Sequence, residues 1–255
     1  MVYFSGLKRF SIVLFALLAA CAVRGAPPPS VSASLEASIS NVIARFSMRW
    51  PGARASGERM VREAFRSKRH DAFYAAKTKL AVIVAGSKAG TGFVMCEGGR
   101  LWLVTNAHVV RGQPIVRATM LDGTDLTLGP CEYAAGRDLA RFPVDGNRPA
   151  LVVRPGLPDV GERVTVLGNT DGRGVITEIN GRVVGVGPTE IEIDAAFTTG
   201  NSGSPVIDRT GRVVAVASYL RNCRNDRDWS KTNTRFNGVR RFALRLAGIK
   251  WERLK

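Results

Sequence analysis

The chain has 255 residues, of which 45% are hydrophobic and 23% are charged, and its formal net charge at pH 7 is +16. This composition is ordinary for a globular protein and excludes wholesale disorder, while the length suits one large all-β domain or two small ones. The positive charge is spread along the chain without zinc-finger spacing or an aromatic RNA-binding signature, so we expect no nucleic-acid partner.

The first residues have the features of an export signal. Two basic residues precede an apolar run, Phe10–Ala20, that is too short to span a bilayer, which predicts a signal peptide over residues 1–25. The run ends in the letters LAAC, Leu18–Cys21, which resemble the lipobox of bacterial lipoproteins. Two alternatives remain open: lipidation of Cys21, which anchors the mature protein to a membrane, or cleavage near Gly25. Both predict an exported bacterial protein, in the periplasm or as an outer-membrane lipoprotein.

Residues 26–79 predict a tether followed by a helical extension. The segment 26–33 is rich in proline and is typical of a flexible linker. Apolar residues then recur at helical spacing over 35–50, and a second, basic helix is expected over about 58–77. We interpret its basic residues as a solvated face beside the next domain, with a membrane-surface or inhibitory role as the alternative.

From Leu80 onward, short apolar runs separated by glycine-rich turns predict an all-β domain over 80–250. The pattern is that of two antiparallel six-stranded β-barrels, 80–145 and 159–246, joined by a segment rich in proline and glycine. The expected strands of the first barrel are Leu80–Ala85, Gly92–Cys96, Leu101–Thr105, Ile115–Met120, Asp125–Leu128 and Leu139–Val144. Those of the second are Arg163–Leu167, Gly174–Ile179, Gly181–Val186, Glu190–Ile193, Pro205–Asp208 and Val213–Ser218, with Arg241–Leu246 as a further candidate.

Three cysteines follow the signal segment: Cys96, Cys131 and Cys223. An exported protein meets an oxidising compartment, and an odd number leaves at least one thiol unpaired within the chain. Because Cys96 and Cys131 both fall in the first predicted barrel, we expect these two to pair. None of the three lies in a CxxC motif or beside a histidine, so we expect no metal site, and nothing indicates a cofactor.

Ser202 is the candidate nucleophile. A serine hydroxyl is weakly nucleophilic at neutral pH and needs a base that is itself oriented by a third group. Gly200 and Gly203 flank Ser202 and allow a sharp turn, which can aim the backbone N–H groups of Gly200 and Ser202 at one developing oxyanion. A plain hairpin turn is the alternative interpretation of this Gly-Asn-Ser-Gly stretch.

His108 and Asp138 supply the two partners that such a serine needs. His108 follows an apolar strand run and is one of only two histidines, the residue type that titrates near neutrality. Asp138 precedes another apolar run and could hold an imidazole in the correct tautomer. Singly, the histidine could cap a strand end and the aspartate could form a turn. The order His, Asp, Ser is that of the chymotrypsin-type triad and differs from those of subtilisins and α/β-hydrolases.

The stretches GTGF, TNAHVV, DLA and GNSGSPV resemble the signature of trypsin-like serine peptidases, most of all the protease domain of the bacterial HtrA/Deg branch, over about residues 80–220. The resemblance implies a serine endopeptidase that acts on polypeptide substrates in envelope protein quality control. It makes His108 the general base, Asp138 its orienting group, Ser202 the nucleophile, and Gly200 with Ser202 the oxyanion hole. The alternative is a protease-fold binding protein with little turnover, anchored at the cell envelope.

The same resemblance implies the specificity pocket. Its base is expected at Ala196 and its walls at Ser218, Tyr219 and Leu220. No acid lies among them, so we expect a small or medium apolar residue at the cleaved position. Ser204 stands where the family usually has glycine, and we expect little effect from it. About 35 residues follow the resembling segment, too few for a PDZ domain, so we expect no PDZ-mediated partner.

Overall fold

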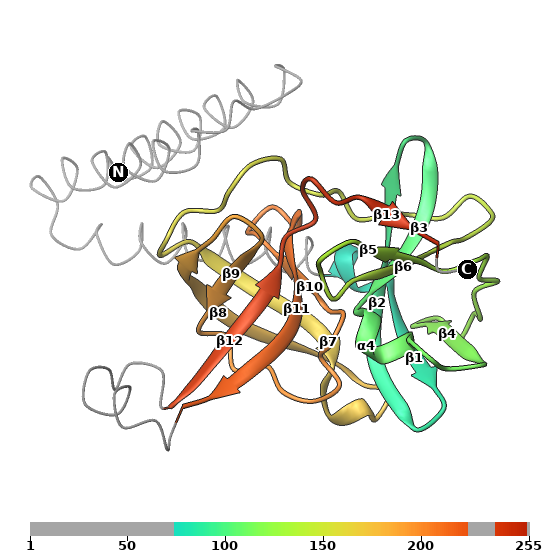
Figure 1. Ribbon diagram of the computed structural model, residues 1–255, viewed down its shortest axis with the longest axis horizontal. Helices are drawn as coiled ribbons and strands as arrows, with labels where there is room; N and C mark the ends of the chain where they lie inside the picture. The colour runs from blue at the N-terminus through green and yellow to red at the C-terminus, as the bar shows by residue number, and fades with distance from the viewer. Residues whose placement is uncertain (1–73, 224–237, 254–255) are drawn as a thin grey trace, which may run out of the picture. The chain divides into compact units, whose positions relative to one another are not determined.

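The computed structural model describes residues 74–223 and 238–253 of the chain (Figure 1). The chain divides into two compact units, Met1–Arg66 and Ser67–Lys255, and every described residue belongs to the second. The expected signal peptide, the lipobox and the first expected helix therefore lie outside the described residues. Of the second expected helix, only residues 74–77 are described, and they are helical. Among the residues that are described, no helix is long and apolar enough to cross a membrane.

The first half of this unit is an antiparallel sheet of seven strands, in the order β13-β5-β6-β3-β2-β1-β4. A one-turn helix follows β3 and packs against the sheet. In chain order the elements are β1 (Leu80–Ala85), β2 (Lys88–Glu97), β3 (Arg100–Thr105), α4 (Ala107–Val110), β4 (Val116–Met120), β5 (Glu132–Ala134), β6 (Ala140–Pro143) and, from the end of the chain, β13 (Trp251–Glu252).

The second half is a closed antiparallel barrel of six strands, in the order β10-β11-β12-β9-β8-β7. A 3-10 turn, η1 (Thr170–Gly172), follows β7. The strands are β7 (Arg163–Asn169), β8 (Ile176–Val186), β9 (Glu190–Ile193), β10 (Pro205–Ile207), β11 (Val213–Asn222) and β12 (Val239–Leu244).

Three hydrophobic clusters explain the long apolar runs of the strands. Successive residues of β2 alternate between two clusters, since Phe93 packs into one and Val94 into another. The cluster around Val94 lies within the first sheet, and a third cluster, around Val166, lies inside the closed barrel. The cluster around Phe93 also contains Leu167 and Val216 from the barrel, so it joins the two halves. Because both faces of the central strands are buried, their sequences are continuous apolar runs.

The expected all-β, trypsin-like fold class is confirmed, with differences in individual strands. The first sheet has a seventh strand, β13, which was not expected, and the short strand β5 was missed. The stretch expected as the strand Asp125–Leu128 forms only isolated bridges, Thr119 with Asp125 and Leu128 with Val144. Pairing of so few residues does not build a strand.

The two strands expected over 174–179 and 181–186 are one continuous strand, β8. Asn180-Gly181 is a hairpin signal by sequence, yet both residues pair with β7, as Asn180 with Thr165 and Gly181 with Val164. A side chain at Gly181 would overlap the backbone of Ala195. The glycine is therefore required by the close approach of a neighbouring segment, and the strand passes through it.

The expected disulfide between Cys96 and Cys131 is not formed, and the three cysteines of the described chain are free thiols. Cys96 lies on β2 and Cys131 directly precedes β5, and β3 and β6 separate these strands in the sheet. Three strand spacings amount to about 14 Å, whereas a disulfide needs Cα atoms within about 7 Å. The prediction that Cys96 and Cys131 pair was therefore wrong, because two residues of the same barrel can lie on strands that are far apart.

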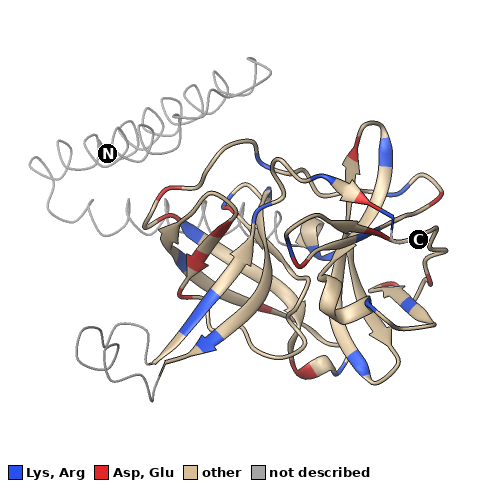
Figure 2. Ribbon diagram, viewed as in Figure 1, with Lys and Arg blue, Asp and Glu red and all other residues tan. Residues whose placement is uncertain are grey.

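Charged residues are distributed over both halves of the described unit. Figure 2 shows Lys and Arg on strands and loops of the first sheet and of the closed barrel, with Asp and Glu interspersed among them. Several form ion pairs across strands, such as Arg240 with Glu192 at 2.7 Å and Arg141 with Glu132 at 2.8 Å. Part of the positive charge is thus neutralised locally.

Candidate active site

His108 is presented by α4, the single helical turn that follows β3. Ala107, Val109 and Val110 of this turn are buried, which fixes the turn against the core of the first sheet. His108 is the one residue of the turn that faces outward, and its side chain is 47% exposed. A strand that ends in a short turn with three apolar residues therefore leaves the imidazole accessible to a substrate.

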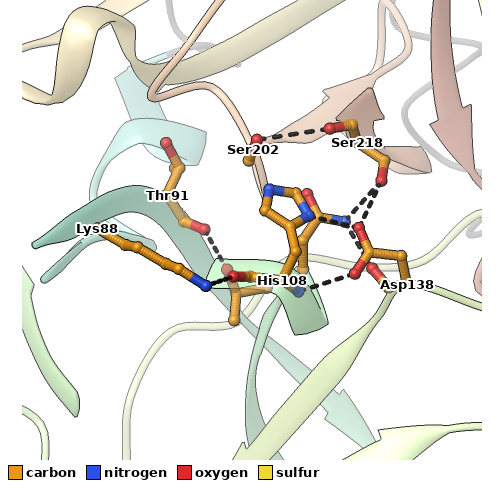
Figure 3. A network of polar contacts seen from close by, with 8 residues as sticks. Lys88, Thr91, His108, Asp138, Ser202 and Ser218 are labelled. Atoms are coloured by element: carbon orange, nitrogen blue, oxygen red, sulfur yellow. Dashed lines mark hydrogen bonds and ion pairs between the residues drawn. The ribbon is translucent and has the colours of Figure 1, made fainter. Parts of the chain in front are cut away.

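Asp138 lies on the turn between β5 and β6 and contacts His108 twice. Its Oδ2 atom lies 2.5 Å from Nδ1 of the imidazole, and its Oδ1 atom accepts a hydrogen bond of 2.8 Å from the backbone N–H of His108 (Figure 3). A carboxylate only accepts hydrogen bonds, so the proton of a neutral imidazole is on Nδ1 and Nε2 has a free lone pair. The second ring nitrogen faces the side on which Ser202 lies.

The ionisation of Asp138 is set by opposing effects. Burial raises its pKa, but the hydrogen bonds and charge of His108, together with a hydrogen bond from Ser218, outweigh burial and hold the pKa below its usual value. Asp138 is consequently a carboxylate at neutral pH, the form that orients an imidazole and stabilises an imidazolium.

Ser218 links Asp138 to the second barrel. It lies on β11 at a register shift between Ala217 and Tyr219, a bulge that re-aims its side chain. Its hydroxyl donates to Oδ2 of Asp138 at 3.1 Å and accepts a bond of 3.1 Å from Nδ2 of Asn106. The side chain of Ser218, a residue expected to line the specificity pocket, is buried and bonded to Asp138. Sequence reasoning missed this contact because no local pattern marks the bulge.

Two glycines shape the loop that carries Ser202. Gly200 has φ +84° and Gly203 has φ +87°, conformations that residues with a side chain rarely adopt. A Cβ atom at Gly200 would overlap the carbonyl of Asn169, and one at Gly203 would overlap the carbonyl of Thr91. The sharp turn expected from the Gly-Asn-Ser-Gly stretch is present, and close packing makes both glycines necessary.

Thr91 of β2 connects this loop to the first sheet. Its hydroxyl donates to the carbonyl of Gly200 at 3.0 Å, and its backbone N–H donates to the carbonyl of Ser202 at 2.9 Å. The hydroxyl of Thr105 in turn donates to the carbonyl of Thr91 at 2.8 Å. Thr105 lies three residues before His108, so a short chain of hydrogen bonds couples the serine loop to the strand that carries the histidine.

The N–H groups expected to form the oxyanion hole are available. Within the described part of the chain, neither the N–H of Gly200 nor that of Ser202 donates a hydrogen bond. The hydroxyl of Ser202 donates to the carbonyl of Ser218 over 3.4 Å (Figure 3). This bond is long and weak, and rotation of the Ser202 side chain is needed to transfer its proton to His108.

The remaining expected pocket residues lie at the surface of the second barrel. Ala196 is exposed, and Leu220 is 44% exposed. The ring of Tyr219 stacks on Phe242 with centroids 4.9 Å apart, and its hydroxyl donates to Glu190 at 2.8 Å. Tyr219 is therefore held along the neighbouring strands β12 and β9.

Ser204 is accommodated by a glycine that lies far away in the sequence. Its hydroxyl is buried and has no hydrogen-bond partner among the described residues. A Cβ atom on Gly168 would overlap this hydroxyl, so the absence of a side chain at 168 provides its space.

Over residues 74–223 and 238–253, no group of three acidic, cysteine or histidine side chains could hold a metal ion.

Residues 90–216 match the family model described as trypsin-like peptidase domain. Together with the two-sheet fold, this match defines the class: residues 90–216 form a trypsin-like peptidase domain, as the resemblance implied.

Its curated relatives are serine endoproteases of the DegP and HtrA kind. The chain is 35% identical over 141 residues to a probable periplasmic serine endoprotease DegP-like of Rhizobium meliloti, covering 51% of this chain and 28% of the relative. It is 31% identical over 167 residues to the chloroplastic Protease Do-like 1 of Arabidopsis thaliana, covering 60% and 36%. The chain thus spans only about a third of the length of these relatives.

Solved structures share the fold. The active form of the Rv3671c protease from M. tuberculosis superposes with a TM-score of 0.56 at 23% identity, covering 69% of this chain and 79% of that one. The serine endoprotease from Yersinia pestis superposes with a TM-score of 0.54 at 21% identity, covering 69% and 62%. At these identities the likeness concerns the fold alone.

Proposed function

We propose that the protein is a serine endopeptidase that hydrolyses peptide bonds through an acyl-enzyme on Ser202. The observation that carries the proposal is the contact of 2.5 Å between His108 Nδ1 and Asp138 Oδ2, with the second ring nitrogen facing Ser202. The DegP-like relatives, named as serine endoproteases, support the same reaction class.

In the acylation step, His108 Nε2 takes the proton of the Ser202 hydroxyl while Oγ forms a bond to the carbonyl carbon of the substrate. The carbonyl oxygen becomes an oxyanion, which the N–H groups of Gly200 and Ser202 stabilise. The tetrahedral species then expels the amine, which receives the proton from His108, and leaves an ester on Ser202. Asp138 stabilises the imidazolium that forms between the two proton transfers.

Deacylation repeats the sequence with water as the nucleophile. His108 removes a proton from water, whose oxygen attacks the ester carbon, and the second tetrahedral species releases the carboxylic acid as Oγ regains the proton. The exposed face of His108 gives water access to this base. No other group is required for either step.

For specificity, we propose a small or medium apolar residue at the cleaved position. Ala196 contributes no charge at the base of the expected pocket, and Leu220 in its wall narrows the pocket. Binding of a long cationic side chain is therefore disfavoured. A peptide library measures this preference directly, and a profile dominated by Arg, Lys or Phe would contradict it.

We place the protein in the bacterial envelope, where it acts on polypeptides in protein quality control. This proposal is supported by the apolar run before Cys21 and by relatives named as periplasmic. Lipidation of Cys21 is the anchoring mode we propose to test. Labelling of cells with an alkyne fatty acid, comparing wild type with Cys21→Ala, gives a lipidated band only for wild type if the lipobox is used.

The second candidate function is an envelope-anchored, protease-fold binding protein with little turnover. The observation that favours it is the bond of Ser202 Oγ to the carbonyl of Ser218, which directs the hydroxyl away from His108. A bound substrate must rotate this side chain for catalysis, and in a binding protein the rotation would not occur.

A fluorescent fluorophosphonate separates the two functions. An activated serine attacks its phosphorus, fluoride leaves, and the protein becomes labelled. The full chain should be labelled, and labelling should vanish in Ser202→Ala, while Ser204→Ala serves as the matched control because it removes a hydroxyl two residues away. A folded wild-type protein that takes up no label contradicts the endopeptidase and favours the binding role.

A further inference from the structure

The turn that carries Asp138 has only five residues, 135–139, between β5 and β6. Two backbone hydrogen bonds close it, from Ala134 N–H to the carbonyl of Leu139 at 3.0 Å and from Leu139 N–H to the carbonyl of Arg137 at 2.9 Å. The strand before it, β5, has three residues, so the turn needs further contacts to hold a carboxylate in one orientation.

The end of the chain supplies such contacts. After β12 ends at Leu244, the chain leaves the closed barrel and returns to the first sheet, where β13 pairs with β5 (Figure 1). We name residues 245–253 the C-terminal strap. The N–H of Ala135, in the turn, donates to the carbonyl of Lys250 in the strap at 2.9 Å. The strap therefore runs directly along the turn that carries Asp138.

Arg137, the neighbour of Asp138, makes the closest connection to the strap. Its Nη1 atom donates to the carbonyl of Arg245 at 2.6 Å and to the carbonyl of Ala247 at 2.7 Å. Hydrogen bonds from an ionised donor are stronger than those between neutral groups, and two from one nitrogen restrict the guanidinium to one place. The backbone of residue 137 is thereby held next to the residue that orients the imidazole.

The strap has a second anchor that does not involve Arg137. The guanidinium of Arg141, on β6, lies 4.4 Å from the ring centroid of Trp251 and 3.8 Å from that of Trp102. The same guanidinium pairs with Glu132 at 2.8 Å. Loss of the Arg137 contacts should therefore leave the strap docked through β13, so the effect on the turn can be separated from loss of the strap.

We propose that Arg137 is a positioning residue, which clamps the C-terminal strap to the β5–β6 turn and so holds Asp138 in register with His108. The inference rests on the proposed function, because it assigns Arg137 to the geometry of the triad. Arg137 touches neither substrate nor the reacting atoms. Its contribution is to keep the carboxylate from drifting, and small displacements of a catalytic group have large effects on rate.

The test compares Arg137→Met and Arg137→Lys with Arg245→Met in the full chain. Arg245 is the matched control, because its Nη1 atom donates to the carbonyl of Pro188 at 2.7 Å, an arginine-to-carbonyl bond of the strap that does not reach the turn. We expect Arg137→Met to lower kcat by about 10- to 100-fold with little change in KM. Arg137→Lys, which retains an ammonium donor, should recover part of the loss, and Arg245→Met should stay within about twofold of wild type.

A proton NMR measurement provides a readout that does not depend on turnover. The hydrogen of the short bond between His108 Nδ1 and Asp138 Oδ2 should give a resonance far downfield, which broadens or moves upfield in Arg137→Met and is retained in Arg245→Met. An unchanged resonance and unchanged kcat in Arg137→Met would overturn the proposal, as would equal losses in both variants. If wild type has no turnover, the proposed function fails, while the resonance still tests the role of Arg137. If Arg137→Met does not fold, the same two measurements on Arg137→Lys decide the role of Arg137.

Discussion

Ser218 and Asp138 come from opposite halves of the domain and are joined by a hydrogen bond of 3.1 Å. Asp138 is thus held by His108 from its own sheet and by Ser218 from the closed barrel (Figure 3). Asn106 binds the Ser218 hydroxyl and also donates to the carbonyl of Asp138 at 2.8 Å. The site therefore lies on the seam between two sheets, and its geometry depends on how the sheets dock.

Removal of the Ser218 hydroxyl should impair catalysis more than stability. Ser218→Ala deletes a hydrogen bond to a carboxylate, an interaction of about 1.5–3 kcal/mol, and we expect kcat to fall by about tenfold or more. Thr165→Val is the control, because it removes another buried hydroxyl, bonded to Asn180 at 2.8 Å, between β7 and β8 of the second barrel. Steady-state kinetics should show normal kcat for Thr165→Val, and equal losses in the two variants would refute a specific role of Ser218.

Acidification should reduce the contribution of Asp138 to stability. Its folded pKa is lowered, so the ionised carboxylate stabilises the fold above the unfolded pKa of about 3.9, and this stabilisation is lost as the pH falls through the lower folded value. The difference in free energy of unfolding between wild type and Asp138→Asn should therefore shrink between pH 6 and acid pH. Urea unfolding at several pH values measures it, and a difference that grows on acidification would contradict the assigned shift.

Substitution of Gly200 should abolish activity through steric overlap as well as through backbone strain. Gly200 and Gly174 have similar φ angles, +84° and +79°, but a Cβ atom at 174 meets no atom within 4 Å. Gly174→Ala should therefore cost only about 1–2 kcal/mol for the left-handed conformation. Gly200→Ala also displaces the carbonyl of Asn169 and moves an oxyanion donor. Fluorophosphonate labelling together with thermal unfolding compares the two, and normal labelling of Gly200→Ala would contradict the expected loss of activity.

Gly168 and Ser204 should be energetically coupled. Gly168→Ala places a methyl group against the Ser204 hydroxyl and should destabilise the fold by about 1–3 kcal/mol. Ser204→Gly in the same chain should restore part of this loss, and only part, because the Asn201 side-chain oxygen also lies 2.7 Å from the added carbon. A double-mutant cycle on unfolding free energies measures the coupling. Strictly additive effects would show that the two residues do not share the space.

Local sequence patterns were sufficient for the parts of the site that depend on neighbouring residues. His108, directly after an apolar strand run, was a candidate base by its position and residue type, and two glycines around Ser202 predicted a sharp loop, because each element is shaped within a few residues. The order of the three candidate residues also indicated which fold could bring them together. The strand boundaries of β1 and β9 followed from apolar runs bounded by turn residues.

Other features depend on which strands become neighbours. Whether Cys96 can reach Cys131 is decided by the two strands between them, and the space around Ser204 is decided by a glycine 36 positions earlier. The bulge that turns Ser218 toward Asp138 arises where β11 pairs with β12, a contact between segments on either side of residues 224–237. Such pairings are selected by the packing of the whole domain, and a short stretch of sequence does not specify that packing.

The amino-acid sequence alone therefore determined the all-β class, the family and the three residues proposed for catalysis, since residue type and order carry that information. Only the tertiary structure decided how these residues are supported: by Ser218 from the second barrel, by Thr91 under the serine loop and by Arg137 against the C-terminal strap. The physical reason is that supporting hydrogen bonds join atoms far apart along the chain, and their partners are defined only once both sheets have packed together.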